Sequence, residues 1–302
     1  MKRSLSLDIF KLFLSFFVVA AHLQPLFEVD ALEGWLVTNG ISRVLVPCFF
    51  MINGYFLASR IDDWQAVKNY LLQLLKVYAV WSLFYLYFYY EGMGIVTIIG
   101  RLAMGYHHLW YLPALLSGVL ILFVLRKFVK QDVHILVLIL ILYLIGHVLD
   151  PTRAMAHYYR NGLFIGFPFI AFGYFIRKYN VKDMFRSWQL IAIIAITFAT
   201  LMLEAYIYYI EGMKVTDMYL SALLLCPAGV LICLKHPLMV RKSAVVEYFS
   251  DLPTGIYYLH LFFIYKMYSP TYNIYTLPWI FLVTALAVIP IIFINRRIRI
   301  FL

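Results

Sequence analysis

Long apolar runs separated by short polar segments dominate the pattern of this chain from residue 5 to residue 295. An α-helix of about 20 residues crosses the hydrocarbon layer of a bilayer, because each residue adds about 1.5 Å. The pattern therefore predicts an all-α polytopic membrane protein with about ten transmembrane helices. The expected spans are 5–27, 36–59, 67–90, 108–126, 133–149, 161–177, 188–210, 216–234, 253–269 and 275–295.

The polar segments between these runs are short. Even the longest of them, 91–107 and 235–252, are too short to fold independently, so we expect a single transmembrane domain over residues 1–302. The apolar stretch 94–105 fits either a short interfacial helix or a re-entrant segment, and the pattern does not decide between them.

Composition agrees with this class, because 64% of the residues are hydrophobic and only 13% are charged. The net charge of +10 is explained by its distribution. With a cytoplasmic N-terminus, the alternating spans place most Lys and Arg residues in cytoplasmic loops, as the positive-inside rule requires. The basic residues expected outside or at the outer rim are Arg101, Arg153, Arg160, Lys214 and Lys266. Both termini are therefore predicted to be cytoplasmic, and no nucleic-acid partner is needed.

Lys11 and His22 stand inside the first apolar run. Ionisable groups within a membrane are costly unless they face a protein interior or a wet cavity, which favours a functional role. At 100° per residue, the two side chains project from one helix face about 16 Å apart. The alternative is that Lys11 extends to the lipid headgroups and His22 is a hydrogen-bonded packing residue.

Several polar residues share a depth in the outer third of the predicted bundle. They are His22, Arg43 and Glu204, with His108, Arg160 and Asn161 at the starts of their spans. Groups at one depth that cannot face lipid must face one another or a cavity, so this set is a candidate reaction centre. Alternatively, Arg43 and Glu204 form a structural ion pair, and Trp110 and Tyr111 are interfacial aromatics.

A second group of basic residues lies nearer the cytoplasm. Lys11 and Lys76 fall within spans, and Arg60 and Lys68 fall at the inner rim. Such residues bind phosphate groups, although ordinary positive-inside anchoring explains Arg60 and Lys68 equally well. His260 lies in the middle of a late span, where it either lines the same cavity or is a satisfied core histidine.

Other catalytic signatures are missing from the sequence. The histidines and the three cysteines lack metal-ligand spacing, so we predict no metal site. Neither a Gly-Xaa-Ser-Xaa-Gly elbow nor a phosphate-binding glycine loop is present, which disfavours a serine hydrolase or a nucleotide-hydrolysing protein.

The chain resembles the bacterial type-3 integral membrane acyltransferases over nearly its whole length. Lys11 and His22 fit a basic residue, ten residues and a histidine, with lysine where arginine is usual. The stretch from Arg43 to Phe56 carries the arginine, proline, double-phenylalanine and glycine motif, with Asn53 where serine is usual. The stretches 108–112 and 160–169, Glu204 and the Gly-Ile-Tyr-Tyr-Leu-His sequence ending at His260 also fit.

The resemblance implies transfer of an acyl group, usually acetyl, from cytoplasmic acyl-coenzyme A to a hydroxyl of an extracytoplasmic or lipid-linked glycan at the bacterial inner membrane. His22 would be the general base or a transient acyl carrier, and Arg43 would stabilise the oxyanion or position the acceptor. Glu204 would orient His22 or balance Arg43. The expected donor-binding residues are Lys11, Lys76, Arg60 and Lys68. The expected acceptor-binding residues are Asn53, His108, Trp110, Tyr111, Arg160, Asn161 and His260.

Two other functions remain open. In a proton-coupled transporter or flippase, the same groups would form a proton relay or an anion path. In a structural or sensory subunit, they would tie helices together. Within the acyltransferase interpretation, acyl chain length is open, and the acceptor is an O-antigen, a capsule, an exopolysaccharide or an amino-acid hydroxyl.

Overall fold

The computed structural model describes residues 2–90, 92–150, 159–213, 215–241, 243–269 and 273–302. Arg153 and Lys214, expected on the outer side, lie outside these residues. The chain forms two compact units. The terminal unit comprises Met1–Leu45 and Lys182–Leu302, and the central unit comprises Val46–Val181.

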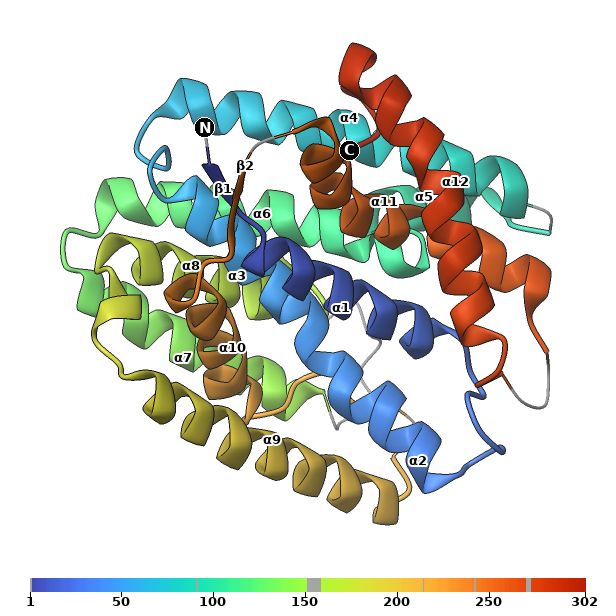
Figure 1. The fold of residues 1–302 in the computed structure, drawn as a ribbon, viewed down its shortest axis with the longest axis horizontal. Coiled ribbons are helices and arrows are strands. Elements are labelled where there is room, and N and C mark those ends of the chain that lie inside the picture. Colours follow the sequence, from blue (N-terminus) through green and yellow to red (C-terminus); the bar gives the residue numbers. More distant parts are fainter. Residues whose placement is uncertain (1, 91, 151–158, 214, 242, 270–272) are drawn as a thin grey trace. The chain divides into compact units, whose positions relative to one another are not determined.

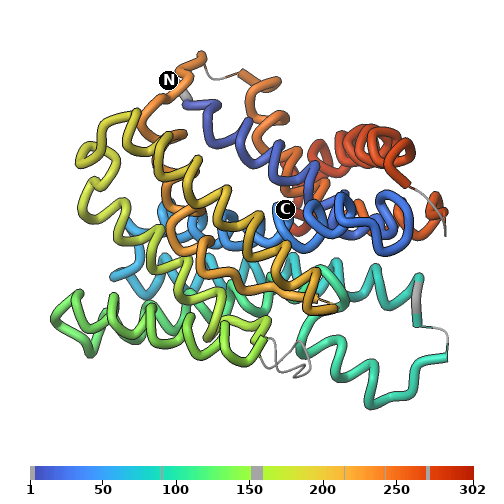
Figure 2. The backbone as a smooth tube through the Cα atoms, turned by 90° about the horizontal axis from the view of Figure 1, so that it is seen from below, coloured from blue at the N-terminus to red at the C-terminus, as the bar shows by residue number. Residues whose placement is uncertain are grey.

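In the terminal unit, helix α1 (Ser6–His22) packs against elements from both ends of the chain. Its neighbours are the π-turn η1 (Leu36–Gly40), the 3₁₀ helix η2 (Ile41–Val44), α10 (Ala222–Lys235), α11 (Ala244–Met267) and α12 (Leu277–Ile298). Figures 1 and 2 show α11 and α12 running side by side, with α11 also against α1. The remaining helices are α2 (Leu32–Trp35) and α9 (Ser187–Ile210), which pack on η1.

A short two-stranded ribbon joins the two parts of the terminal unit. Strand β1 (Lys2–Ser4) pairs antiparallel with β2 (Met239–Arg241), with Arg3 opposite Val240. The backbone N–H of Leu5 extends the pairing by donating to the carbonyl of Leu238 at 2.9 Å. The start of α1 is thereby fixed beside the segment that leads into α11.

The central unit is built around α6 (Tyr111–Phe128). This helix packs against α4 (Trp64–Tyr89), α8 (Phe167–Lys178), the 3₁₀ helix η3 (His107–Trp110) and the π-turn η5 (Gly162–Gly166). The other elements are α3 (Leu45–Leu57), α5 (Ile95–Met104), α7 (Asp132–Leu149) and the 3₁₀ helix η6 (Val181–Asp183) at the boundary of the unit. Helix α5 has no buried residue, and it occupies the stretch expected to be interfacial or re-entrant.

Helices α3 and α8 meet backbone to backbone at two glycines. A Cβ at Gly54 would lie 1.9 Å from the carbonyl oxygen of Ile170, and a Cβ at Gly173 would lie 1.9 Å from that of Met51. Small residues at helix interfaces permit such approach within membranes, where association depends on close packing. These glycines therefore fix the spacing of α3 and α8.

We expect Gly173→Ala to destabilise the protein by about 3 kcal/mol, because the added methyl group must displace backbone rather than a flexible side chain. Its thermal unfolding midpoint should fall by about 5 °C. The matched control is Gly100→Ala on α5, where a Cβ meets nothing within 4 Å. Equal midpoints for the two variants would contradict the close contact.

Each predicted span overlaps a helix, which confirms a helical membrane protein. Among the described residues, six segments are long and apolar enough to cross a membrane. They are Leu32–Leu57, Trp64–Phe88, His107–Phe128, Asp132–Leu149, Ser187–Ile210 and Leu277–Ile298. The count of ten spans and the cytoplasmic location of both termini stay predictions.

Two helix starts differ from the predicted span boundaries. Helix α11 begins at Ala244, well before residue 253, and it continues through Pro253. Proline has no N–H, so it leaves the carbonyl of Phe249, four residues earlier, without its usual helical partner, which membrane helices tolerate where neighbouring groups satisfy that carbonyl. Ser15 of α1 contacts the same part of α11 by donating to the carbonyl of Pro253 at 3.2 Å. Helix α10 begins at Ala222, and residues 216–220 before it are not helical.

Candidate active site

The packing of α1 on α11 brings two of the predicted site histidines together. His22 is the last residue of α1, and its side chain is exposed. His260, on α11, is fully buried. Their ring centroids are 5.2 Å apart, with the ring planes inclined at 41°. An accessible imidazole therefore stands directly against a buried one.

The buried ring has a defined hydrogen-bonding direction. Nδ1 of His260 lies 3.0 Å from the carbonyl oxygen of Ile256 and 2.8 Å from that of Tyr257. Carbonyl oxygens only accept, so Nδ1 must donate and carry the hydrogen. In the neutral ring, Nε2 then holds the lone pair. His260 is thus a core histidine, held at Nδ1 by two backbone carbonyls, that adjoins His22, and its place in a cavity wall stays a prediction.

Lys11, nearer the other end of α1, is an ion-paired residue. Its ammonium lies 2.8 Å from Oδ1 of Asp8 and donates to the carbonyl of Ser250 at 3.4 Å. The hydroxyl of Ser250 donates to the other Asp8 oxygen at 2.9 Å, and both partners are buried. Lys11 is therefore held by Asp8 on its own helix and by Ser250 on α11. The missed partner Asp8 stands three residues earlier, a spacing that places it on the same helix face.

Arg43 is held by two side chains that the sequence analysis missed. One guanidinium nitrogen donates to Asp217 and the other donates to Asn39, on the preceding π-turn. The side chains of Arg43 and Asp217 are 17% and 8% exposed, so the ion pair is largely withdrawn from water. The partner of Arg43 is thus Asp217, and the alternative pairing of Arg43 with Glu204 is wrong.

Glu204, on α9, holds the start of α10. Its carboxylate accepts from the backbone N–H groups of Leu220 at 3.1 Å and Ser221 at 3.2 Å, and also from the Ser221 hydroxyl. These two N–H groups belong to the turn just before α10, which begins at Ala222. The start of a helix carries partial positive charge, so a carboxylate at this position is favourable. This contact assigns Glu204 a part in positioning α10.

We expect Glu204→Gln to lower the free energy of unfolding by about 1 kcal/mol, because a neutral amide replaces the carboxylate at the start of α10. Thermal unfolding in lipid nanodiscs measures this effect. Glu211→Gln is the matched control, since Glu211 is exposed just after α9. The same midpoint for Glu204→Gln and the control would contradict the capping role.

A cavity of about 1080 Å³ opens in the terminal unit beyond the end of α1. Gln24, shortly after His22, contributes to its wall, as does Asn39, which holds Arg43. Glu28, Asp30, Trp35 and Tyr209 are also in the wall. The remaining lining residues are Pro25, Leu26, Val29, Ala31, Gly34, Thr38, Ile210, Gly212, Met213 and Tyr268. The cavity thus adjoins segments carrying two of the predicted catalytic residues.

In the central unit, Asn53 joins three helices. Its amide nitrogen donates to the Tyr111 hydroxyl at 2.8 Å and to the carbonyl of Phe49 at 2.9 Å. Its amide oxygen accepts from the Tyr70 hydroxyl, also at 2.8 Å. The asparagine in place of the usual serine thus connects α3 to α4 and α6. Tyr111 is buried in this network. It therefore packs the interior of the central unit, in contrast to the interfacial aromatic considered above.

The other predicted acceptor residues of the central unit lie in its packed interior or at helix starts. His108 is buried edge-on against Tyr85, with ring centroids 5.0 Å apart. Trp110 meets Phe50 at 6.3 Å. Asn161 caps η5 by accepting from the N–H groups of residues 163 and 164, and Arg160 precedes it. His260 alone of the predicted acceptor set belongs to the terminal unit.

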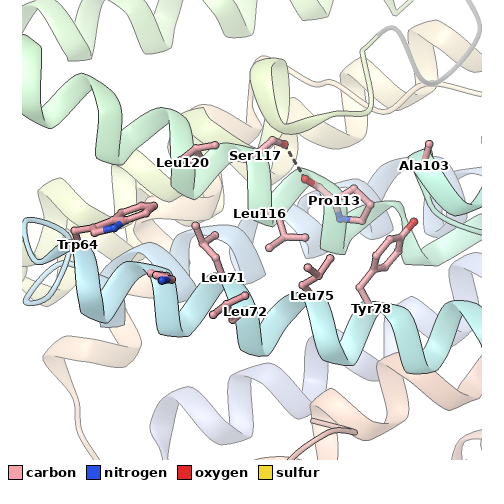
Figure 3. Close-up of a pocket in the computed structure, with 11 residues that line it drawn as sticks. Trp64, Leu71, Leu72, Leu75, Tyr78, Ala103, Pro113, Leu116, Ser117 and Leu120 are labelled. Carbon is pink, nitrogen blue, oxygen red and sulfur yellow. Dashed lines mark hydrogen bonds between the residues drawn. The ribbon is translucent and has the colours of Figure 1, made fainter.

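An apolar groove of about 510 Å³ runs along α4 in the central unit (Figure 3). Lys68 is its charged lining residue among those described. The other lining residues are Trp64, Leu71, Leu72, Leu75, Tyr78, Ala103, Pro113, Leu116, Ser117 and Leu120. Arg60, in the turn before α4, and Lys76, on α4, are exposed. The predicted donor residues other than Lys11 therefore lie on or near α4.

The apolar helices long enough to cross a membrane indicate a multi-pass membrane protein, and the exposed His22 beside the buried His260 is a candidate acid–base site within it. A family model described as an acyltransferase domain matches residues 4–296. The chain therefore belongs to this acyltransferase family.

The curated relatives that match are longer proteins. A serine/alanine racemase from Enterococcus gallinarum is 29% identical over 72% of this chain and 35% of its own length. An amino-acid racemase from Enterococcus faecalis is 25% identical over 85% of this chain and 40% of its own length. The chain thus spans well under half of these relatives. No solved structure matches it.

Proposed function

We propose that this chain is an integral membrane O-acyltransferase. It takes an acyl group, which we propose to be acetyl, from cytoplasmic acyl-coenzyme A and transfers it to a hydroxyl of an extracytoplasmic or lipid-linked glycan. The protein lies in the bacterial inner membrane with a cytoplasmic N-terminus. Within the acyltransferase family, the observation that carries this proposal is the accessible His22 imidazole held against His260.

His22 acts on the acceptor hydroxyl in this proposal. The imidazole takes the hydroxyl proton as the oxygen attacks the thioester carbonyl carbon, the carbon–sulfur bond breaks, and the thiolate leaves and is protonated. His260 positions His22, because its own ring is fixed by two backbone carbonyls. Arg43, itself fixed by Asp217 and Asn39, supplies positive charge that stabilises the oxyanion.

The α4 groove is the proposed donor site. Its apolar walls suit an elongated pantetheine arm and acyl chain, and Lys68 with exposed Arg60 and Lys76 supplies cations for phosphate groups. Lys11, in the terminal unit, is held by Asp8, and its part in donor binding stays a prediction.

We expect Lys68→Ala to raise the KM for acyl-coenzyme A about fivefold with little change in kcat, because an exposed charge-assisted contact to phosphate contributes about 1 kcal/mol. Initial rates of thiol release at varied thioester concentration measure both constants. Lys130→Ala, an exposed lysine between α6 and α7, is the control. An unchanged KM would show that the groove does not bind the acyl donor.

The acceptor is tested by mass spectrometry. Purified protein in nanodiscs is given short acyl-coenzyme A donors with glycan fractions or with hydroxy amino acids. The amino acids belong in the panel because the matching relatives are named as racemases of amino acids. Thiol release together with an acylated product supports the proposal. Absence of thioester turnover with every donor and acceptor would overturn it.

A further inference from the structure

The cavity beyond α1 belongs to the terminal unit alone. It is bounded by the segment that follows His22 and by Asn39, whose amide oxygen holds the Arg43 guanidinium. A molecule within it would therefore lie beside segments that carry a proton acceptor and a cation. With about 1080 Å³, it has room for a sugar ring or a short saccharide.

Two aromatic side chains of the cavity wall are fixed at their polar ends. The indole N–H of Trp35 donates to the carbonyl of Ala205 at 2.7 Å, and the Tyr209 hydroxyl donates to the carbonyl of Asp30 at 2.9 Å. The two ring centroids are 6.1 Å apart. Aromatic faces held in this way provide a rigid surface for the apolar face of a sugar or for a cation.

The charge of the wall is acidic. Glu28 and Asp30 are exposed in it, and the lining residues that the structure describes include neither lysine nor arginine. This local charge is opposite to the net charge of +10 of the chain. Asp30 also adopts φ of 60°, which a residue other than glycine takes at a cost. Carboxylates at such a wall attract ammonium groups and repel anions.

We propose that this cavity binds the acceptor and selects one that carries a protonated amino group beside its hydroxyls, such as an amino sugar. This inference rests on the proposed function for the reaction and adds the class of acceptor. Glu28 and Asp30 hold the ammonium group, and Trp35 and Tyr209 support the ring. The paired ammonium has no lone pair with which to attack, so the acyl group goes to a hydroxyl.

Binding without any acyl donor tests this proposal. Glucosamine, with glucose as the neutral probe of the same shape, is titrated into the protein in nanodiscs and followed by saturation-transfer NMR. We expect glucosamine to bind about tenfold more tightly than glucose, and the double variant Glu28→Gln with Asp30→Asn to remove the difference. Glu33→Gln, an exposed carboxylate on α2 outside the cavity wall, should retain it.

A third variant separates charge from stacking. Trp35→Leu should lower the affinity for glucosamine and for glucose by a similar factor, because it removes the aromatic face and leaves both carboxylates. Thermal unfolding of each variant shows whether it folds, and the exposed carboxylates should be replaceable without loss of stability. Equal binding of the two sugars by the wild-type protein, or an unchanged preference in the folded double variant, would overturn the proposal.

The two proposals fail in different ways. If the protein binds glucosamine through Glu28 and Asp30 but never consumes a thioester, the acyltransferase proposal is wrong and the cation-selective cavity stands. If thioester is consumed but the folded double variant acylates amino sugars at the wild-type rate, the proposal that the cavity selects the acceptor is wrong and the acyltransferase proposal stands.

Discussion

His22→Ala is expected to lower the rate of acyl transfer by about a thousandfold while the protein stays folded. The loss follows because a positioned general base contributes roughly 10² to 10⁴ in rate. Folding should persist because the His22 side chain is exposed, so its removal leaves no buried void. Thiol release at saturating donor and acceptor gives the rate, and thermal unfolding gives the stability.

The control for this experiment is His134→Ala. His134 is an exposed histidine on a helix, as His22 is, but it lies on α7 of the central unit. Its loss should leave the rate unchanged. Full turnover by His22→Ala would remove the proposed base from the mechanism.

Asp217→Ala is expected to destabilise the protein by about 3 kcal/mol and to depress acyl transfer. The reason is that the largely buried Arg43 guanidinium loses the carboxylate that balances its charge. Chemical or thermal unfolding measures the first effect. Asp62→Ala provides the contrast, because the Asp62 side chain is 69% exposed and its pair with Arg126 should contribute little.

A double variant separates the structural part of Arg43 from its catalytic part. Arg43→Met with Asp217→Leu removes both charges, so it should recover most of the stability that Asp217→Ala loses. Acyl transfer should stay low, because no cation remains to stabilise the oxyanion. Recovery of both stability and rate would show that Arg43 is a packing residue only.

The sequence predicted the helices well because apolar runs of membrane length leave few other structures. The expectation of a largely buried Arg43 agrees with the structure, where its side chain is 17% exposed, but His22 and Lys76, also expected inside spans, are exposed. The partners of polar residues were harder to predict, because hydropathy gives depth along a span but not the direction in which a side chain points. Asp217 stands 174 residues from Arg43, in a non-helical stretch that hydropathy assigned to a span.

The local pair of Asp8 and Lys11 was accessible from the sequence, since a spacing of three residues on a helix places both on one face. Glu204 shows the opposite case. Its contact depends on where α10 begins, and the prediction started that span too early, at residue 216. The site of the terminal unit therefore required the packing of α1, α9, α10 and α11 to be known.

The central claim is transfer of an acyl group across the membrane, and sidedness tests it most directly. Protein reconstituted in sealed vesicles is loaded with acetyl-coenzyme A carrying a labelled acetyl group, and acceptor is supplied only outside. We predict free thiol inside and an equal amount of labelled ester on the external acceptor. Uptake of intact acceptor with no loss of thioester would contradict the account and identify a transporter.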